Sequence, residues 1–406
     1  MGNGTVDTLK KAYYRAFQEG LNIGARALPW RKPKTFTGEG CAARIPEIMQ
    51  SAGVRRVMVV TGRHVGKSIA PGIIDSLRAA GIECVHFSEV EANPTTAIVD
   101  KIVWSYRLNA CDGFLAIGGG SPIDAAKAAA ALIARPDMTL EKMAGLFKVL
   151  HRLPPFVAVP TTAGTGSETT IAAVITDSET HHKYAVMDIC LVPHYAVLDP
   201  VLTRDLPKKS TSTTGMDALT HAVEAYLCWT NRTREVDRLA EEATVTIFKY
   251  LERAYRDGND MEARENMLMA AFKAGFAFTR AGVGNVHAIA HTLGGLYNVP
   301  HGLANAVILP IVLEDYGERA YPRLARLAEI TGTKTDGSDA DKAKAFIAEV
   351  YAMNERMEIP RGIEGIREED IPQMVKWALA EANPTYPVPV VYTAEHCAEV
   401  IRRIML

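Results

Sequence analysis

The 406-residue sequence lacks the features that mark several broad classes of protein. Its formal net charge is only −2 and it contains no block of lysine and arginine, so we expect neither nucleic acid nor an anionic membrane as a partner. No apolar run is long enough to span a bilayer, and residues 1–20 lack the apolar segment of a secretion signal. We therefore expect a cytoplasmic protein that binds small molecules.

Cysteine is also scarce and carries no pattern. The six cysteines form no C-x-x-C pair, so we expect free thiols in a reducing compartment and no disulfide framework. With 48% hydrophobic and 23% charged residues, the chain is long enough to bury the cores of two ordinary domains.

The first half of the chain has the rhythm of a parallel sheet. Short β-branched runs alternate with helical stretches between residues 54 and 200, a pattern that is typical of α/β domains. The predicted strands are RVMVVT (56–61), ECVHF (83–87), GFLAI (113–117) and FVAVP (156–160). Two further runs, 172–176 and 195–199, flank His181-His182-Lys183 and are predicted to form a hairpin beside the sheet.

The second half is helical almost throughout. The helical pattern begins near residue 206, and Pro207 marks the change of architecture. Long amphipathic stretches lie near 236–257, 261–280, 303–316 and 338–354. We predict an α/β domain with a Rossmann-like parallel sheet over residues 1–206, in which 1–35 form an N-terminal extension. An all-helical domain is predicted over residues 207–406.

Acidic and imidazole side chains recur at helical spacing in this second half. Asp217 and His221 are four residues apart within MDALTHAVEAY, so both project from one helix face. His287 and His291 repeat that spacing, and His301 follows a Val-Pro break. Two histidines four apart occur often by chance, but this conjunction favours a site for an Fe, Zn or Mn ion over one for Mg or Ca.

A glycine-rich turn in the first half predicts a phosphate site. Strand GFLAI runs into Gly118-Gly119-Gly120-Ser121-Pro122 and then into an alanine-rich helix. Ser121 is expected to cap this helix and Pro122 to occupy its first position, which directs free N–H groups and the helix dipole at an anion. A tight turn without a ligand is the alternative, since the motif is not G-x-G-x-x-G.

A second polar loop, PTTAGTGSE (160–168), follows strand FVAVP at its carboxyl end. Ligands of parallel sheets bind at that edge, so its hydroxyl groups are expected to bind a ribose, a pyrophosphate or a nicotinamide amide. An ordinary Ser/Thr-rich loop is the alternative interpretation.

Four segments together resemble the iron-containing (group III) alcohol dehydrogenase family. They are GGGSPIDAAK (118–127), PTTAGTGSE (160–168), TGMDALTHAVEAY (214–226) and the HAIAH…PHG segment (287–302), and they occur in the family's order. The resemblance covers roughly residues 36–406. It implies a dinucleotide-binding α/β domain followed by a helical metal domain, which agrees with the change of pattern near residue 206.

The resemblance also assigns roles to individual residues. The metal ligands that it implies are Asp217, His221, His287 and His301. The dinucleotide ligands that it implies are Asn93, Gly119, Gly120, Ser121, Thr161, Thr162, Thr165 and Lys183. His291 is then not a metal ligand but lies near the nicotinamide and the substrate, where it moves a proton. Asp217 and His291 are therefore the expected catalytic residues, and Phe278 is expected to wall the substrate pocket.

Two positions depart from the family pattern. Gly62 stands at the end of the first strand, where relatives that prefer NAD usually carry Asp, so it cannot repel a 2′-phosphate. With Arg63 and Lys67 close by, NADP is expected to be accepted. Arg280 replaces a common Asn. It is expected to form a structural or subunit salt bridge, and the alternative is that it binds an acidic aldehyde in the pocket.

The expected function is hydride transfer between NAD(P) and a small primary alcohol or aldehyde bound to a divalent metal. Iron is the expected ion, with zinc and manganese as alternatives. The rival enzyme class is a lyase resembling dehydroquinate synthase, which turns the nucleotide over without net redox change. A metal-dependent hydrolase and a scaffold without turnover are further alternatives. A homodimer or larger homo-oligomer is expected, with residues 1–35 contributing contacts.

Overall fold

The computed structural model of the chain describes residues 2–26, 28–180 and 183–406. Contacts within the chain group it into two compact units. The sheet unit consists of Pro29–Pro207 and Asp257–Gly275, and the helical unit consists of Met1–Leu28, Lys208–Arg256 and Phe276–Leu406. Both contain many fully buried apolar side chains, so each has a core of its own.

These units differ from the predicted division in two segments. Residues 1–28 belong to the helical unit, because Gln18 and Arg15 hydrogen-bond to carbonyl groups of residues 384–389. Residues 257–275 belong to the sheet unit, where Leu268 packs with strand residues near 196–198. Neither contact has a local signal in the sequence, since each joins residues far apart along the chain.

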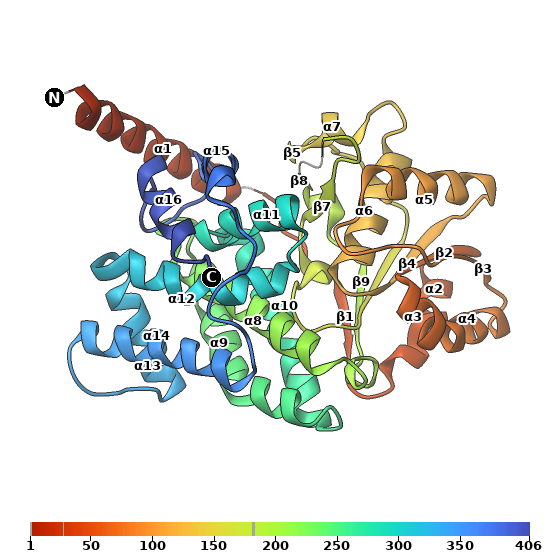
Figure 1. Ribbon diagram of the computed structural model, residues 1–406. Helices are drawn as coiled ribbons and strands as arrows, with labels where there is room; N and C mark the ends of the chain where they lie inside the picture. Colours follow the sequence, from red (N-terminus) through yellow and green to blue (C-terminus); the bar gives the residue numbers. More distant parts are fainter. Residues whose placement is uncertain (1, 27, 181–182) are drawn as a thin grey trace. The chain divides into compact units, whose positions relative to one another are not determined.

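The sheet unit contains a six-stranded, fully parallel sheet in the order β1-β9-β6-β4-β2-β3 (Figure 1). Its strands are β1 (Lys34–Thr37), β2 (Arg56–Thr61), β3 (Glu83–Phe87), β4 (Gly113–Gly118), β6 (Phe156–Pro160) and β9 (Tyr195–Leu198). The register pairs Gly118 of β4 with Pro160 of β6. The two predicted nucleotide loops therefore leave the sheet at the same level of its carboxyl edge.

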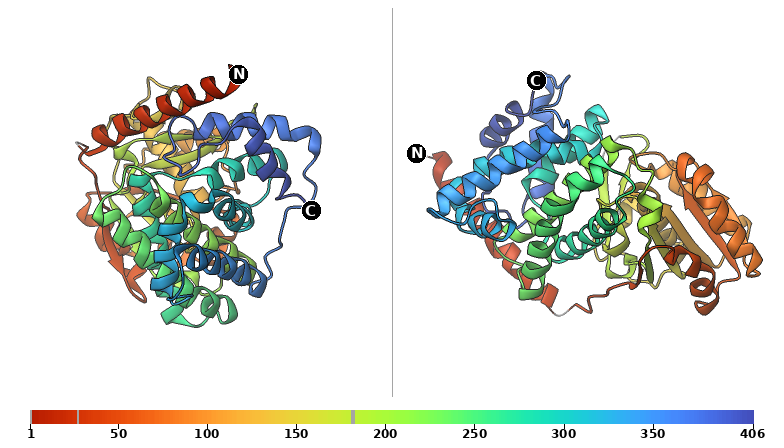
Figure 2. Two further views of the ribbon diagram at one scale, coloured as in Figure 1. Left: turned by 90° about the vertical axis from the view of Figure 1, so that its left-hand side faces the viewer. Right: turned by 90° about the horizontal axis from the view of Figure 1, so that it is seen from below.

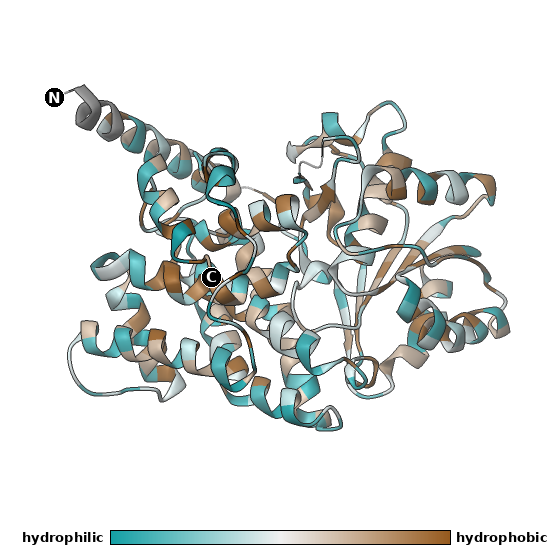
Figure 3. Cartoon of the chain, viewed as in Figure 1, coloured by the Kyte–Doolittle hydropathy of each residue, from teal (hydrophilic) through white to brown (hydrophobic). Residues whose placement is uncertain are grey.

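Alternating strand residues cover the sheet on both faces. Met58, Phe114 and Phe156 join one buried cluster with α5 and α6, whereas Val59, Leu115 and Val157 join another with α2 and α4. Figure 3 shows these strands as largely hydrophobic. This two-sided burial explains why the strands are nearly continuous apolar runs in the sequence. The helices are α2 (Ile45–Ser51), α4 (Ala70–Ala79), α5 (Thr96–Leu108) and α6 (Gly120–Ala134).

The predicted hairpin has a different partner. Residues 172–176 form β7 (Ala172–Thr176), but β7 pairs antiparallel with β8 (Lys183–Met187), while 195–198 form β9 of the main sheet. The run 195–199 was misassigned because an apolar strand of that length is compatible both with a hairpin beside the sheet and with a position in the main sheet. β5 (Gly145–Leu146) completes this small second sheet beside β8. The predicted neighbours His181 and His182 lie outside the described residues.

Short helices occupy connections of the sheet unit. They are η1 (Cys41–Arg44), α3 (Arg63–Ser68), α7 (Leu140–Met143), η2 (Ser167–Thr169), η3 (Ile189–Leu191) and η4 (Pro200–Thr203). Among them, η2 matters for the candidate site, because it begins within the second predicted nucleotide loop.

The helical unit contains no strand among its described residues, and Figure 2 shows its helices from two further sides, the N-terminal one in red and the others in green to blue. They are α1 (Gly2–Arg26), α8 (Lys208–Leu227), α9 (Arg234–Arg256), the end of α10 (Met261–Ala281), α11 (Asn285–Tyr297), α12 (His301–Tyr316), η5 (Gly317–Arg319), α13 (Tyr321–Thr331), α14 (Asp339–Arg356), η6 (Glu368–Asp370), α15 (Ile371–Ala382) and α16 (Ala394–Arg402). Among the described residues, no helix combines the length and the apolar content that a membrane crossing needs.

Candidate metal centre and nucleotide loops

One buried face of α8 carries three polar side chains that the candidate site uses. Asp217, His221 and Glu224 stand at positions i, i+4 and i+7, so they share a face of the helix. All three are almost fully buried, between 1% and 4% exposed. Removing polar groups from water costs free energy unless they gain hydrogen-bond or metal partners. This face therefore predicts an organised polar site.

Glu224 organises the N-terminus of α11. Its Oε2 accepts from the Gly284 amide at 2.9 Å and from His287 Nδ1 at 2.5 Å, while its Oε1 accepts from the Val286 amide at 2.8 Å. A Cβ atom on Gly284 would lie 2.6 Å from Oε1, so a larger residue there would displace this carboxylate. The bond to Nδ1 fixes the ring of His287 and leaves its Nε2 directed at the rest of the cluster.

α12 is the third helix that contributes side chains to the cluster. His301 is the first residue of this helix, and Asn305 follows one turn later. The fully buried Asn305 directs its Nδ2 at three atoms: Asp217 Oδ1 at 2.7 Å, His287 Nε2 at 3.1 Å and His301 Nε2 at 3.1 Å. Lone pairs of three separate side chains thus converge on one small volume.

The structure brings together the four predicted metal ligands. Asp217, His221, His287 and His301 each offer one ligand atom, and these atoms lie within 4.8 Å of one another. Ligands of one transition-metal ion lie about 2.0–2.2 Å from it, so a small contraction of the cluster would let one ion contact all four. Three imidazoles and one carboxylate are the donors that Fe, Zn or Mn prefers, so the residues present fit such an ion.

Burial and neighbouring charges act in opposite directions on the titratable groups of this cluster. Burial raises the pKa of Asp217, although His287 and the hydrogen bond from Asn305 act in the opposite direction. Burial by itself would lower the pKa of His287, but the adjacent Glu224 and Asp217 raise it above its ordinary value. A cation held between these groups would satisfy the same lone pairs without a bound proton.

His291 lies one turn after His287 but outside the four-residue cluster. Its Nδ1 bonds Glu381 Oε1 at 2.6 Å, and the Tyr386 hydroxyl donates to the same oxygen at 2.7 Å. Burial would raise the pKa of Glu381, but His291 and Tyr386 outweigh it and hold that pKa below its ordinary value. An ionised Glu381 accepts both bonds, so the Nδ1–H tautomer of His291 is favoured and Nε2 remains for other contacts.

The two predicted pocket residues lie differently. The Phe278 ring stacks on the His221 ring at 4.2 Å between centroids, beside the cluster. Arg280 instead binds Glu235 Oε2 at 2.6 Å, and its guanidinium lies over the Phe276 ring. This is the salt bridge that the sequence favoured over contact with an acidic substrate.

The two predicted nucleotide loops lie against each other. A Cβ atom on Gly119 would lie 3.2 Å from Thr162 Oγ1, and one on Gly120 would lie 2.8 Å from Thr165 Cγ2. The small size of glycine therefore lets the start of α6 approach the second loop. Thr161 of this loop is buried, and its amide donates to the Gly118 carbonyl at 2.9 Å.

The start of α6 differs from the predicted start in one respect. The helix begins at Gly120, and its N-cap residue Gly119 makes no side-chain capping bond. Ser121 and Pro122 thus lie inside the first turn, and the prediction that Ser121 caps the helix was wrong. The physical reason is that glycine adopts the extended N-cap conformation readily, so the helix starts two residues early. The first-turn N–H groups still lack helical partners, which suits an anion.

Lys127 and Asp124, on the buried side of α6, were missed as organising residues. Lys127 is fully buried, and its Nζ donates to the carbonyls of Ser167, Thr170 and Ala172 at 2.6–3.0 Å. Asp124 accepts from the Ser167 hydroxyl at 2.5 Å and from the Val174 amide at 3.1 Å. Burial lowers the pKa of Lys127 to about 8 despite Asp124 nearby. The sequence signal that could have identified this pair is the lysine within the alanine-rich sequence of α6.

The remaining predicted nucleotide residues lie at loops of the sheet unit. Asn93 adopts a left-handed φ of 55° just before α5. Pro94, the residue after Asn93, accepts at its carbonyl from the Thr176 amide, and Thr176 pairs with Lys183 across β7 and β8. Thr176 therefore connects the segment of Asn93 to the strand of Lys183. Gly62 is the N-cap residue of α3, where exposed Arg63 forms an ion pair with Glu91 at 3.3 Å.

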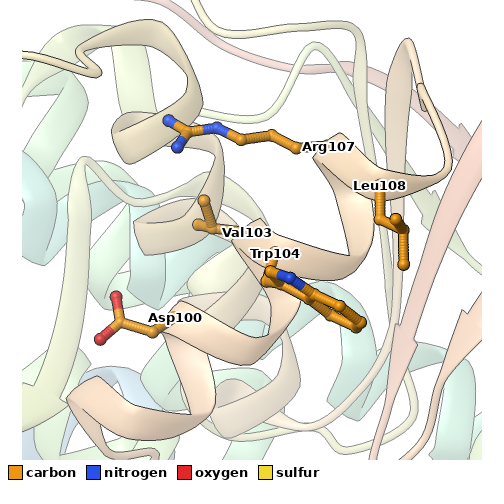
Figure 4. A pocket seen from close by; sticks show the side chains of 5 residues that line it. All are labelled: Asp100, Val103, Trp104, Arg107 and Leu108. Carbon is orange, nitrogen blue, oxygen red and sulfur yellow. The ribbon is translucent and has the colours of Figure 1, made fainter.

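A separate depression of about 510 Å³ lies along α5 (Figure 4). It is lined by Asp100, Val103, Trp104, Arg107 and Leu108. Trp104 is 66% exposed, and none of the lining residues belongs to the metal cluster or to the nucleotide loops. This surface therefore adds nothing to the candidate site.

Sequence comparisons agree with this arrangement. Residues 32–200 match the iron-containing alcohol dehydrogenase family, and residues 211–405 match its C-terminal part. A 1,3-propanediol dehydrogenase of Klebsiella pneumoniae is 38% identical over 356 residues, which is 86% of this chain and 91% of that protein. An NAD-dependent methanol dehydrogenase of Bacillus methanolicus is 34% identical over 377 residues, which is 92% of this chain and 98% of that protein.

The fold agrees as well. A crystal structure of a 1,3-propanediol oxidoreductase superposes with a TM-score of 0.88 and 34% identity, covering 92% of this chain and 99% of that one. Such agreement over nearly the whole length includes both the parallel sheet and the helices that carry the metal cluster. The chain therefore belongs to the iron-containing alcohol dehydrogenase family.

Proposed function

We propose that this protein is a metal-dependent alcohol dehydrogenase and aldehyde reductase that exchanges hydride between NAD(P) and a small primary alcohol or aldehyde. The observation that carries the proposal is the convergence of Asp217, His221, His287 and His301, from three different helices, within 4.8 Å. Family membership supports the same chemistry.

The helical unit would hold the metal and orient the substrate oxygen. A divalent ion held by the four donors supplies Lewis acidity toward an alcohol or carbonyl oxygen, and bound nicotinamide supplies or accepts the hydride. Glu224 fixes the tautomer of His287, and the Phe278 ring covers one face of the His221 ring. Iron is the proposed ion, with zinc or manganese as functional substitutes.

His291 is proposed to move the proton. Its Nδ1 is held by Glu381, so Nε2 is the nitrogen that exchanges a proton with the substrate side. Replacement of His291 by Ala should lower kcat and change the pH profile while the metal content stays constant. A normal kcat with an unchanged pH profile in a metal-loaded His291→Ala enzyme would remove this role.

The sheet unit would hold the dinucleotide. Gly119, Gly120 and Ser121 are proposed to bind the pyrophosphate with backbone and hydroxyl groups at the start of α6. The residues proposed to line the rest of the nucleotide site are Gly62, Asn93, Thr161, Thr162, Thr165 and Lys183. NADP acceptance is proposed from Gly62, whose lack of a carboxylate leaves room for a 2′-phosphate. A preference for NAD of more than tenfold in kcat/KM would contradict it.

The substrate is proposed to be a neutral aldehyde or alcohol. Arg280 is paired with Glu235, which supports a structural role over recognition of an acidic group. If Arg280→Ala selectively raised the KM for an acidic aldehyde relative to a neutral one, the guanidinium would be a substrate contact. No feature of the described residues favours a lyase, a hydrolase or a scaffold. A homo-oligomeric state and a cytoplasmic location stay predictions.

The test is absorbance at 340 nm with protein loaded separately with Fe(II), Zn(II) or Mn(II), with NADH or NADPH and a panel of neutral and acidic aldehydes. We expect metal-dependent loss of absorbance that disappears in Asp217→Ala. Protein that binds both metal and nucleotide yet oxidises neither reduced cofactor would argue against the dehydrogenase. Comparison of the three metals and two cofactors gives the preferences directly.

A further inference from the structure

The N-terminal helix α1 lies outside the two segments that match the family, which begin at residue 32. One side of it is nevertheless part of the core of the helical unit. Gln18 is fully buried, whereas Leu9 and Tyr13 are 66% and 59% exposed. A buried glutamine is costly unless its amide finds partners, so its contacts indicate what this helix does.

Gln18 binds the loop of residues 383–389, called here the 383–389 loop. Its Nε2 donates to the carbonyls of Pro384 at 3.0 Å and Tyr386 at 2.8 Å. Its Oε1 accepts from Trp229 Nε1 at 2.6 Å, so both ends of the amide are used. Arg15, one turn earlier on the helix, donates to the Val388 carbonyl at 2.8 Å and to the Pro389 carbonyl at 3.1 Å.

The composition of this loop explains why it needs an external partner. The sequence NPTYPVP contains three prolines, which carry no N–H group. The loop therefore has few donors for its own carbonyls, and α1 supplies side-chain donors to four of them. Without them, the Tyr386 carbonyl would keep only the Val388 amide at 2.9 Å, and the other three carbonyls would lose these donors or the loop would move to reach water.

The same loop carries the phenol that reaches toward His291. Tyr386 donates its hydroxyl to Glu381 Oε1, which also binds His291 Nδ1. The peptide carbonyl of Tyr386 is held by Gln18, and its hydroxyl holds Glu381. A continuous series of hydrogen bonds thus runs from Gln18 through Tyr386 and Glu381 to His291.

We propose that α1 is a positioning element of the active site, in which Gln18 holds the 383–389 loop so that Tyr386 and Glu381 orient the imidazole of His291. The inference rests on the proposed function, in which His291 acts near the substrate. Gln18, Tyr386 and Glu381 are positioning residues that act through His291. Small displacements of a catalytic group are costly, because proton transfer needs near-contact geometry.

The first test is Gln18→Met, which keeps length and helix propensity but removes both amide donors and the acceptor. In full-length, metal-loaded enzyme we expect kcat to fall about tenfold, the size of a sub-ångström misplacement, with KM for nucleotide unchanged. Tyr13→Ala, on the exposed side of the same helix, is the matched control and should retain the wild-type kcat. Bound metal and melting temperature are measured for every variant.

A double-mutant cycle separates positioning from general stabilisation. Tyr386→Phe removes only the hydroxyl and should itself lower kcat; adding Gln18→Met to it should lower kcat little further, because the series is already interrupted. Equal effects of Gln18→Met in both backgrounds would overturn the proposal. So would a fall in bound metal or melting temperature that accounts for the fall in kcat, since α1 would then be a stabilising element only.

These outcomes are distinct from failure of the proposed function. A wild-type enzyme that binds metal and nucleotide but reduces no aldehyde removes the function, and the inference falls with it. A wild-type enzyme that turns over while Gln18→Met matches its kcat removes the inference alone. Tyr386→Phe keeps the test decisive if Gln18→Met fails to fold, because a wild-type kcat in Tyr386→Phe would also overturn it.

Discussion

The metal cluster and the nucleotide loops are built in different ways. In the helical unit, Asp217 and His287 offer side-chain atoms as metal ligands, and further side chains, chiefly Glu224 and Asn305, determine their orientation. In the sheet unit, Gly119 and Gly120 offer backbone, and the loops around them are held by the buried Lys127. The first site should therefore be sensitive to the chemistry of individual side chains, whereas the second should be sensitive to added volume.

The largest effect that sharpens this contrast is expected from Glu224→Gln. A glutamine offers one oxygen where the carboxylate accepts three hydrogen bonds through two, so one donor of α11 is left facing an amide N–H. We expect metal affinity to weaken by about 10–100-fold, the usual cost of losing an outer carboxylate. Competition with a chelator measures it. Glu399→Gln, the same change on the exposed side of α16, should leave affinity unchanged.

A smaller effect is expected from Gly120→Ala in the sheet unit. The new methyl group would lie 2.8 Å from Thr165 Cγ2, and overpacking of this kind costs about 1–3 kcal/mol. Nucleotide should bind about tenfold more weakly, with metal affinity unchanged. Titration of NADH fluorescence measures the affinity for nucleotide, and competition with a chelator measures the affinity for metal. Gly72→Ala, where a Cβ meets open space, is the control.

Relief of the clash provides an internal check. Thr165→Ser removes the methyl group that the new Cβ meets but keeps the hydroxyl that accepts from the Ser167 amide. Combined with Gly120→Ala, it should restore part of the lost nucleotide affinity. If it restored none, volume would not be the cause, and the contrast between the two sites would lose its basis.

The same contrast explains what the sequence could predict. Asp217 and His221 were recognisable because two metal-ligand side chains on one helix face have a fixed spacing, and the buried strands β2 and β6 were recognisable as apolar runs with their observed bounds. Glu224 had a signal too, at i+7 from Asp217. Glu381 and Gln18 had none, because His291 lies 90 residues from Glu381, and Trp229 and the 383–389 loop lie 211 or more residues from Gln18. Such contacts depend on tertiary packing.

Cofactor choice is expected to respond to charge at one backbone position. Gly62→Asp places a carboxylate where a 2′-phosphate would lie, so kcat/KM with NADPH should fall about tenfold while that with NADH is retained. Gly62→Asn has nearly the same shape and meets the same Val90 carbonyl at 3.0 Å, so it isolates the charge. Equal losses in the two variants, with either cofactor, would indicate crowding instead of charge.

The smallest effect concerns a buried carboxylate of the sheet unit. Glu224 has three donors, whereas Glu168 Oε1, although buried, has no hydrogen-bond partner among the described residues. Burial raises the pKa of Glu168 to about 7, from an ordinary 4.5. Between these pH values the folded chain binds more protons than the unfolded chain, so the stabilisation present below pH 4.5 is lost as the pH rises through 7.

Glu168→Gln mimics the protonated acid and should remove this dependence. We expect the melting temperature of the wild type to fall relative to Glu168→Gln between pH 5 and pH 8, by an amount that corresponds to about 1–3 kcal/mol. Exposed Glu179→Gln, in the same unit, should follow the wild type at every pH. A constant difference between wild type and Glu168→Gln would mean that Glu168 is ionised throughout. The sheet unit would then stabilise a buried charge as the helical unit does, and the two sites would differ less than their hydrogen bonds indicate.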